Sequence, residues 1–267
     1  MSDLRYQQQT YELRGLIFEA RKRLRAGWPE DVYREGLVQI MRDRAVPVAT
    51  KLRKTIFHRG IEVHLFECDV MAWDLIILEL KALPYSTITS AHFAQLINYL
   101  KCWNKHLGLL VNFGSTYADI QRIVWDEPQL NLAEHYDAIN PLLNDFDRAC
   151  LDRIRQHIMT IGQQYGLGYS EVVYRRIAAI EMQYNGLCCE VDVEVPAKLG
   201  ARLLQCYKSD HLLIENRYLL SVRSLLDHPP AYDFARMKTY LNSLGLAFGL
   251  IVNFGKKELQ IYGVNPD

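Results

Sequence analysis

The stretch FAQLINYLKCWNKHLGLLVNFG, residues 93–114, aligns without gaps with FARMKTYLNSLGLAFGLIVNFG, residues 234–255, and ten of the twenty-two positions are identical. The same offset of 141 residues places GWPEDVY, which starts at Gly27, over GYSEVVY, which starts at Gly168. A repeat of this length is a whole domain, because solenoid and propeller units run to only about 20 to 50 residues. The sequence therefore predicts two tandem copies of one fold.

The length and composition of the chain are those of an ordinary globular protein. Its 267 residues suffice for two domains that each bury a core. The polar start MSDLRYQQQT and the lack of an apolar run near the roughly 18 residues of a membrane span predict a cytoplasmic protein without a membrane partner. Six cysteines without CxxC spacing are expected to be buried, reduced thiols.

Apolar periodicity and turn residues predict three helices and five strands in the first copy. The helices are expected at 12–25, 30–44 and 89–106, and the strands at 47–50, 61–70, 75–81, 107–112 and 120–124. This order indicates an α/β or α+β sandwich, and we take α/β, with a mixed central sheet flanked by helices, as the fold class. We expect a first domain at 1–125, an acidic linker at 126–148 and a second domain at 149–267.

The segment ECDVMAWDLIILELKAL, residues 67–83, carries the candidate chemistry. Side chains alternate along a strand, so Glu79 and Lys81 project to one face of it. A turn near residue 74 would place Asp69 opposite Glu79, with Cβ atoms about 4.5 to 5.5 Å apart. Two facing carboxylates repel each other, and a hard cation such as Mg²⁺ would remove that repulsion. Lys81 would then balance the charge and could hold a hydroxide or a phosphate oxygen. A salt-bridged cluster on a solvated sheet face is the alternative.

Asp69, followed ten residues later by Glu79, Leu80 and Lys81, reproduces the D…ExK core of the PD-(D/E)xK nuclease superfamily. The first copy also resembles the bacterial GxxExxR protein family in five ordered blocks. These blocks are ELRG (12–15), GWPEDVY (27–33), ELKAL (79–83), AQLINYL (94–100) and GLLVNFG (108–114). The basic run RKRLR at 21–25, and a Gly27 without its usual Gly-Pro-Gly setting, depart from the family pattern.

The resemblance implies two tandem restriction-endonuclease-like domains and divalent-metal-dependent hydrolysis of phosphodiesters, with DNA as the favoured partner. Metal binding by Mg²⁺ or Mn²⁺ would fall to Asp69, Glu79 and the main-chain carbonyl of Leu80. Lys81 would position or activate the attacking water. The full catalytic set that the resemblance implies is Glu30, Asp69, Glu79, Lys81 and Gln95.

Two members of that set have alternative interpretations. Glu30 matches the helical glutamate of the superfamily, but an acid in the first turn of a helix is also favoured by the helix dipole. Gln95 matches a polar residue that orients the site, but it can equally be an ordinary surface residue of its helix.

The charge of the chain does not by itself indicate a nucleic-acid-binding protein. Residues 1–126 carry 17 Lys plus Arg against 14 Asp plus Glu, and the remainder carries 14 against 17. Contact with phosphates must therefore come from a local patch, for which Lys51, Arg53 and Lys54, with Arg59 nearby, are the best candidates. A solvated loop between strands would explain the same charges.

The second copy keeps the pattern of the fold and loses most of the site. Asp210 lies at the offset of Asp69, but a one-residue shift places Ser221, Val222 and Arg223 at the ExK positions, and Arg236 replaces Gln95. We expect Asp210 to form salt bridges with Arg223 and Arg236, and contact of these arginines with phosphate is the less favoured alternative. The active site is therefore expected in the first copy only.

Two functions remain open at this point. The leading hypothesis is a metal-dependent nuclease whose degenerate second copy serves as a scaffold, a substrate platform or the partner in an intramolecular pseudo-dimer. The alternative is a non-catalytic pseudo-nuclease that acts as an interaction scaffold or a nucleic-acid-binding module.

Overall fold

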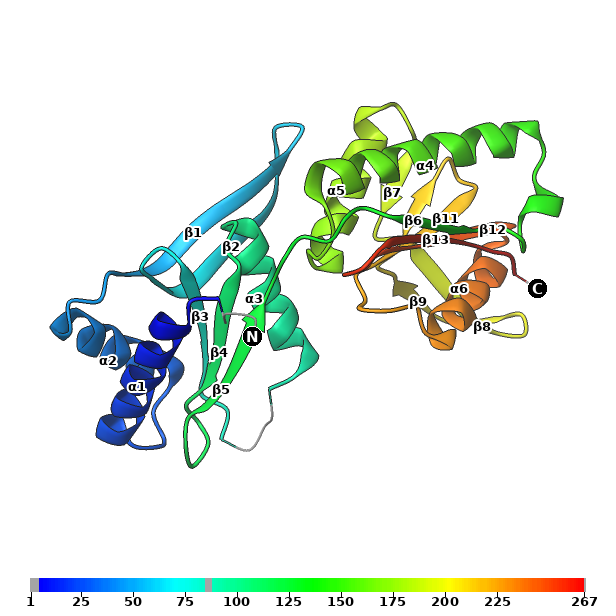
Figure 1. Cartoon of the computed structure of the whole chain (residues 1–267). Helices are drawn as coiled ribbons and strands as arrows, with labels where there is room; N and C mark the ends of the chain where they lie inside the picture. The colour runs from blue at the N-terminus through cyan, green and yellow to red at the C-terminus, as the bar shows by residue number, and fades with distance from the viewer. Residues whose placement is uncertain (1–4, 85–87, 267) are drawn as a thin grey trace. The chain divides into compact units, whose positions relative to one another are not determined.

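The computed structural model describes residues 5–84 and 88–266 of the chain, which divide into two compact units (Figure 1). The first unit extends to Ile56 and continues over Leu65–Asp126. The second unit comprises Phe57–His64 and the chain from Glu127 onward. The tip of a hairpin from the first copy of the repeat is thus part of the second unit.

The first copy contains the predicted helices and strands, with ends that differ by a few residues. Its helices are α1 (Gln7–Leu24), α2 (Glu30–Asp43) and α3 (Ser90–Cys102), and its strands are β1 (Val48–His58), β2 (Ile61–Ala72), β3 (Ile76–Lys81), β4 (Leu107–Asn112) and β5 (Asp119–Val124). One prediction is wrong: the strand expected at 47–50 continues to His58. The basic residues around Lys51 therefore lie on a strand and not in a loop. Side chains along this strand alternate between half-buried and exposed over much of its length.

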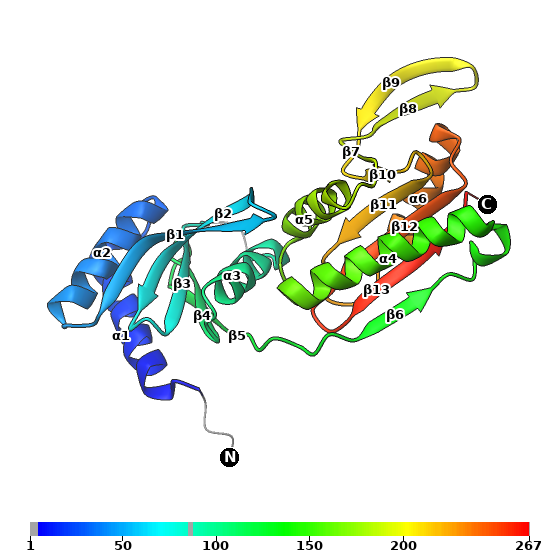
Figure 2. The same cartoon turned by 90° about the horizontal axis from the view of Figure 1, so that it is seen from above.

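The five strands form one mixed sheet in the order β1-β2-β3-β4-β5. The β2–β3 and β4–β5 pairs are antiparallel and the β3–β4 pair is parallel. Figure 2 shows α1 and α2 on one side of the sheet and α3 on the other. Leu78 and Leu80 of β3 pack in the core under α1 and α2, whereas Gly108 of β4 lies directly under Leu96 of α3. The predicted α/β class is confirmed.

The second copy repeats this arrangement with additional strands. Its elements are β6 (Leu132–His135), the 3₁₀ turn η1 (Asn140–Leu142), α4 (Asp145–Tyr165), α5 (Glu171–Tyr184), β7 (Cys189–Val191), β8 (Glu194–Leu199), β9 (Arg202–Lys208), β10 (Leu212–Ile214), β11 (Tyr218–Arg223), α6 (Ala231–Leu244), β12 (Phe248–Phe254) and β13 (Leu259–Val264). Six strands form a sheet in the order β6-β13-β12-β11-β10-β7, and β8 and β9 form a separate ribbon. In Figure 1, α4 and α5 cover one face of the sheet and α6 the other.

The segment 126–148, which was expected to be a linker, contributes structure to the second copy. Strand β6 pairs in parallel with β13 from Leu132 to His135. Helix α4 begins at Asp145 with Asn144 as its N-cap, whose side chain accepts a hydrogen bond from the Asp147 amide.

A buried tyrosine occupies the same place in each copy. The Tyr33 ring stacks on Phe113 with 4.8 Å between ring centroids, and Tyr174 stacks on Phe254 at 4.2 Å. Each hydroxyl donates a 2.7 Å hydrogen bond to a main-chain carbonyl eight residues earlier. These residues join the first two helices of each copy to the end of β4 or of β12, which explains why both GWPEDVY and GYSEVVY end in tyrosine.

The shared VNFG motif fixes the main chain just after the neighbouring strand, which is β3 in the first copy and β11 in the second. Asn112 accepts hydrogen bonds from the amides of Leu83 and Gly114, at 2.8 and 3.0 Å. A Cβ on Gly114 would lie 2.4 Å from the Leu83 nitrogen, so only glycine fits there. In the second copy Asn253 accepts from the Leu225 amide at 2.8 Å. The motif is therefore a structural requirement of the fold.

Within residues 5–84 and 88–266, no helix combines the length and the apolar character of a membrane span. All six cysteines are free. Cys68, Cys102, Cys150 and Cys189 are buried, but Cys188 and Cys206 are exposed, so the expectation of buried thiols is wrong for these two.

Candidate active site

A two-residue turn between β2 and β3 sets the alignment of the candidate site. Trp73 and Asp74 both have positive φ, 52° and 53°. The Leu75 amide donates to the Ala72 carbonyl at 2.9 Å and closes the turn. This is the type I′ geometry that suits the twist of paired strands in short hairpins.

The register of this hairpin brings the two carboxylates to the same position. Val70 pairs with Leu78, so the next pair toward the open end of the hairpin is Asp69 and Glu79. Here the strands begin to diverge, and Asp69 accepts a hydrogen bond from the Leu80 amide at 2.9 Å. The arrangement agrees with the alternation expected from the sequence.

Glu79 is a buried carboxylate with an unsatisfied oxygen. It is only 2% exposed, and one oxygen accepts a hydrogen bond from Lys81 at 2.5 Å. The other oxygen, Oε2, has no hydrogen-bond partner in the described part of the chain. Burial, together with the nearby charge of Asp69, raises the pKa of Glu79 to about 8. Without a further cation, this carboxyl group holds a proton near neutral pH.

Lys81 remains positively charged in this environment. Burial by itself lowers the pKa of Lys81, but Glu79, Glu30 and Asp69 outweigh that effect and raise the pKa above its usual value. Glu30, at the start of α2, lies 3.7 Å from the Lys81 ammonium, and burial raises the pKa of Glu30. The structure thus brings four of the five expected catalytic residues together.

Arg34 is a site residue that the sequence reasoning missed. Its guanidinium lies 3.5 Å from Asp69, and the residue is 9% exposed. The signal was present, because Arg34 is one helical turn after Glu30 and must share its face of α2. Arg34 holds Asp69 in place from the side opposite Leu80.

Gln95 contacts the candidate site through a tyrosine. Its side-chain amide donates to the Tyr99 hydroxyl at 2.9 Å. Tyr99 is buried, and burial together with the charge of Glu79 raises its pKa above the usual value. Tyr99 is thus the residue that connects Gln95 with the carboxylates.

The expected nucleic-acid-binding residues do not form one patch. Arg53 pairs with Glu67 at 2.6 Å on an exposed surface, and Lys54 donates to the Cys102 carbonyl at 2.6 Å. Lys51 instead lines a groove beside α2 together with Arg34. Alternation along β1 separates Lys54 from the other two.

The residues present fit a hard divalent cation. No three Asp, Glu, His or Cys side chains among the described residues converge closely enough to hold a metal by themselves. Asp69 and Glu79 supply two carboxylates, and main-chain carbonyls and water are the further ligands that Mg²⁺ accepts. The unpartnered Oε2 and the raised pKa of Glu79 are the features that a nearby cation would correct.

In the second copy the register identifies the equivalent positions. Glu79 pairs with Leu110 across β3 and β4, and Ser221 pairs with Ile251 across β11 and β12, so Ser221 takes the place of Glu79. The last pair of the hairpin is Leu212 with Leu220, so the register, extended by one residue beyond β10, reaches His211 beside Ser221.

The chain leaves the sheet between β9 and β10, and the hairpin pairs show that the offset has changed from 141 to 142 at β10. Residues 209–211, which include both Asp210 and His211, lie in that break. Arg175, the equivalent of Arg34, donates to the Asp210 main-chain carbonyl at 3.1 Å.

The charged residues of the second site are paired with one another. Arg223 binds Asp233 at 2.9 Å and Glu171 at 3.1 Å, so its expected pairing with Asp210 is replaced by these two. Arg236 lies 3.6 Å from Asp210, as expected for an ion pair. Two arginines thus stand where the first copy has Lys81 and Gln95.

A family model described as the PD-(D/E)XK nuclease superfamily matches residues 7–123 and, separately, residues 148–262. No curated protein matches the chain. A solved structure titled "Crystal structure of SSO0001" is similar with 18% sequence identity and a TM-score of 0.28, and the match covers 35% of this chain and 48% of that one. The chain thus matches about half the length of that protein, and nothing about the site is inferred from it.

Proposed function

The chain belongs to the PD-(D/E)XK nuclease superfamily, and from this membership we propose that its first copy is a divalent-metal-dependent nuclease that hydrolyses phosphodiester bonds of nucleic acid, with DNA favoured. The observation that carries the proposal is Glu79, a buried carboxylate with one unpartnered oxygen. It lies beside Asp69 and Lys81, in the order and spacing of the D…ExK motif. Burying a carboxylate with only one of its oxygens paired is costly, which argues for a ligand that the site is built to hold.

The metal would be held by Asp69 and Glu79 with the Leu80 carbonyl, and Mg²⁺ or Mn²⁺ suits these oxygen ligands. When bound, such an ion supplies positive charge to the phosphate and lowers the pKa of water beside it. Glu79 would lose its proton on binding, since the ion favours the carboxylate form.

The other residues of the site would orient the reactants. The Lys81 ammonium, within reach of Glu79 and Glu30, would hold an oxygen of the phosphate or of the attacking water. Arg34 would keep Asp69 aimed at the site. Gln95 would act through Tyr99.

The finer assignments are also proposals. Within the superfamily we place the chain with the GxxExxR proteins on its five sequence blocks, and we expect it to act in the bacterial cytoplasm. The second copy, which lacks the carboxylate pair, would serve as a scaffold or a substrate platform.

One observation favours a non-catalytic module instead. The Lys81 ammonium already neutralises one oxygen of Glu79, and a site satisfied in this way could bind nucleic acid without a metal. This second candidate predicts binding that weakens with salt but no cleavage.

Cleavage of labelled single-stranded DNA, duplex DNA and RNA with Mg²⁺, with Mn²⁺ or with a chelator tests the proposal. Asp69→Asn and Glu79→Gln are expected to reduce cleavage by about 10²-fold or more, because each removes one of the two carboxylate ligands of the metal. The matched control is Ser221→Ala, at the position of Glu79 in the second copy, and it should cleave as the unmodified protein does.

Isothermal titration with Mn²⁺ gives a second readout that does not depend on the substrate. We expect binding to the unmodified protein and to Ser221→Ala, and none to Glu79→Gln. Full cleavage by Glu79→Gln, or cleavage that survives the chelator, would show that the proposal is wrong.

A further inference from the structure

The two copies contain the same groove at the same place in the repeat. In the first copy it lies against α2 and β1, and in the second against α5 and β7. Every residue that lines the first groove has its equivalent, 141 positions later, in the lining of the second. Arg34 corresponds to Arg175, for example, and Thr50 to Val191. The groove volumes are also close, about 460 and 420 Å³.

In the first copy this groove opens beside the catalytic carboxylates. Arg34 lines the groove and lies 3.5 Å from Asp69. In the second copy Arg175 lines the groove and donates to the Asp210 main-chain carbonyl at 3.1 Å, and His211 lines the groove as well. The groove has therefore been kept in a copy that lost its carboxylate pair.

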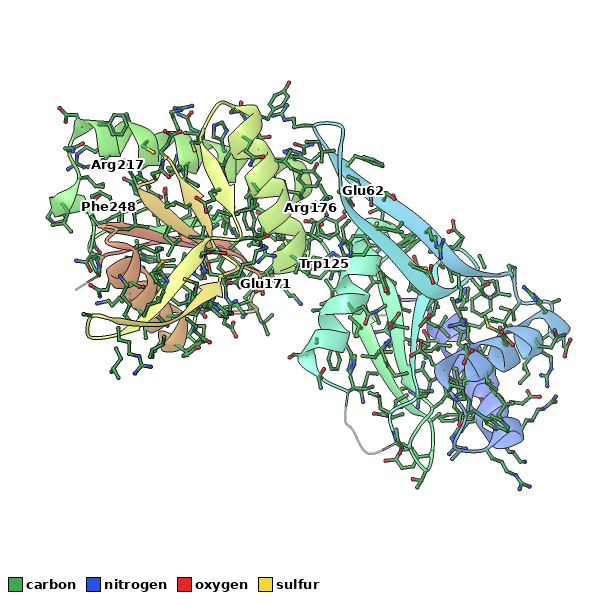
Figure 3. The ribbon with its side chains drawn as sticks, turned by 180° about the vertical axis from the view of Figure 1, so that it is seen from behind. Glu62, Trp125, Glu171, Arg176, Arg217 and Phe248 are labelled. Carbon is green, nitrogen blue, oxygen red and sulfur yellow. The ribbon has the colours of Figure 1, made fainter. Side chains whose placement is uncertain are left out.

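The second groove combines an apolar wall with basic side chains. Its apolar residues are Val172, Ala179, Ile180, Val191 and Leu212. Arg175 and Arg176 of α5 supply positive charge, and Figure 3 shows Arg176 on this helix together with Glu171 near its N-terminal end. The first groove has Asp31, Glu35 and Gln39 where the second has Val172, Arg176 and Ile180. Asp192 and Gln183 stand where the first groove has Lys51 and Arg42. The second lining therefore has more apolar surface, and two arginines against one carboxylate.

His211 provides a buried polar atom at this groove. The side chain is 1% exposed, and its Nδ1 has no hydrogen-bond partner among the described residues. Asp210 Oδ1 lies 3.2 Å from this nitrogen, an ion-pair distance, and its charge opposes the effect of burial on the ring. Burial lowers the pKa of His211, so the ring is neutral near pH 7 and one of its nitrogens can accept a hydrogen bond.

We propose that the groove of the second copy binds one nucleotide unit of a nucleic-acid strand without a metal ion. The base would lie on the apolar wall, Arg175 and Arg176 would bind the phosphate, and His211 would hydrogen-bond a polar edge of the base. Flat rings pack well on apolar surfaces, and arginine matches phosphate geometry. The choice of nucleic acid as the source of the nucleotide rests on the proposed function.

Binding of a fluorescein-labelled single-stranded DNA of twelve nucleotides to the full chain tests this inference. The Asp69→Asn background and a chelator keep the strand intact and remove any metal. Arg176→Glu is expected to weaken binding by about tenfold or more, the effect of losing one charge-assisted hydrogen bond. Arg202→Glu, a charge reversal on exposed β9 outside both grooves, should change the Kd by less than about twofold.

A second variant tests the apolar wall. Ala179→Leu fills the groove with a larger side chain and should also weaken binding by about tenfold. Thermal unfolding of each variant shows whether it is folded. Unchanged affinity in folded Arg176→Glu and Ala179→Leu would overturn the inference.

A titration with dAMP separates the two sources of a nucleotide. Weak binding of dAMP beside tight binding of the oligonucleotide supports a strand, and equal affinities would overturn that assignment. Because these assays contain no metal, failure of the groove and failure of the nuclease proposal give different results. If the unmodified protein cleaves and Arg176→Glu binds the strand unchanged, only the groove proposal is contradicted. If the groove variants weaken binding but the unmodified protein does not cleave, only the nuclease proposal is contradicted.

Discussion

The two copies of the repeat keep one scaffold and differ in the charges that it carries. Tyr33 and Tyr174 stack on equivalent phenylalanines, and Asn112 and Asn253 accept equivalent main-chain hydrogen bonds. At the position where the first copy buries Glu79, the second buries Ser221. The fold therefore does not require the carboxylate. A buried charged side chain that is costly and that the fold does not require points to function.

The two sites also balance their charges differently. In the second copy one arginine, Arg223, binds both Asp233 and Glu171. In the first copy Glu79 shares Lys81 with Glu30 and keeps one oxygen unpartnered. Unpartnered atoms occur at both sites, because Asp210 Oδ1, His211 Nδ1 and Arg236 Nη2 also lack hydrogen-bond partners among the described residues. The two sites differ in the charge that is left over, a carboxylate oxygen of Glu79 in the first and a guanidinium of Arg236 in the second.

Replacing the basic side chain of each site should affect the cleavage rate in the first copy and the free energy of unfolding in the second. Lys81→Met is expected to lower cleavage by about 10²- to 10³-fold, because it removes charge that would face the phosphate. Arg223→Met should leave cleavage unchanged but cost the second copy about 3 kcal/mol, because it leaves the buried Asp233 without its partner. Single-turnover cleavage and urea unfolding measure the two effects. Equal loss of cleavage in both variants would remove the distinction between the copies.

The glycine of the VNFG motif should matter more in the first copy than in the second. A Cβ at Gly114 would lie within 2.4 to 2.6 Å of main-chain atoms of Ala82 and Leu83, whereas the nearest atoms at Gly255 are 2.9 to 3.3 Å away. We expect Gly114→Ala to lower the free energy of unfolding by about 3 kcal/mol and Gly255→Ala by about 1 kcal/mol. Urea unfolding of the two variants checks this order, and a larger loss for Gly255→Ala would contradict it.

The stability of the metal-free protein should fall with rising pH because of the first copy only. The pKa of Glu79 is raised to about 8, so the folded state binds more protons than the unfolded state between about pH 4.5 and 8. The free energy of unfolding then decreases through this window, by up to a few kcal/mol at about 1.4 kcal/mol per pKa unit. The raised pKa of Glu30 acts in the same direction.

Urea unfolding with a chelator at several pH values measures this dependence. Glu79→Gln should remove most of the slope, whereas Ser221→Ala should keep it. A slope that is unchanged in Glu79→Gln would assign the effect to other groups.

The smallest expected effects are those that the copies share. Tyr33→Phe and Tyr174→Phe each remove one hydrogen bond to a main-chain carbonyl and keep the stacked ring. Each should cost about 1 kcal/mol of unfolding free energy, and neither should change cleavage at a temperature where the protein is folded. A loss of activity specific to Tyr33→Phe would give this residue a role beyond packing.

Much of the fold could be predicted from the sequence because the patterns that indicate its helices and strands are local. The alternation in residues 75–81 and the apolar run in 107–112 predicted β3 and β4 almost to the residue. The strand at 48–58 was predicted to end too early, at residue 50, because exposed basic residues resemble those of a loop when their burial is unknown. The same local alternation brought Asp69 opposite Glu79.

Other parts of the site depend on tertiary packing and could not be predicted from the sequence. The hydrogen bond from Gln95 to Tyr99, whose pKa the charge of Glu79 helps to raise, follows from how α3 lies on the sheet. The grooves required helix and strand together, so residues such as Arg34 and Lys51, far apart in sequence, share a lining.

By itself, the sequence determined the duplication, the α/β class and the difference between the two copies, because periodicity and residue identity survive in any linear alignment. Tertiary structure alone decided that the hairpin register of the second copy leads to His211 and not to Asp210. A single added residue between two strands leaves a sequence alignment nearly unchanged. In a sheet it moves a side chain to the opposite face, because successive residues point in opposite directions.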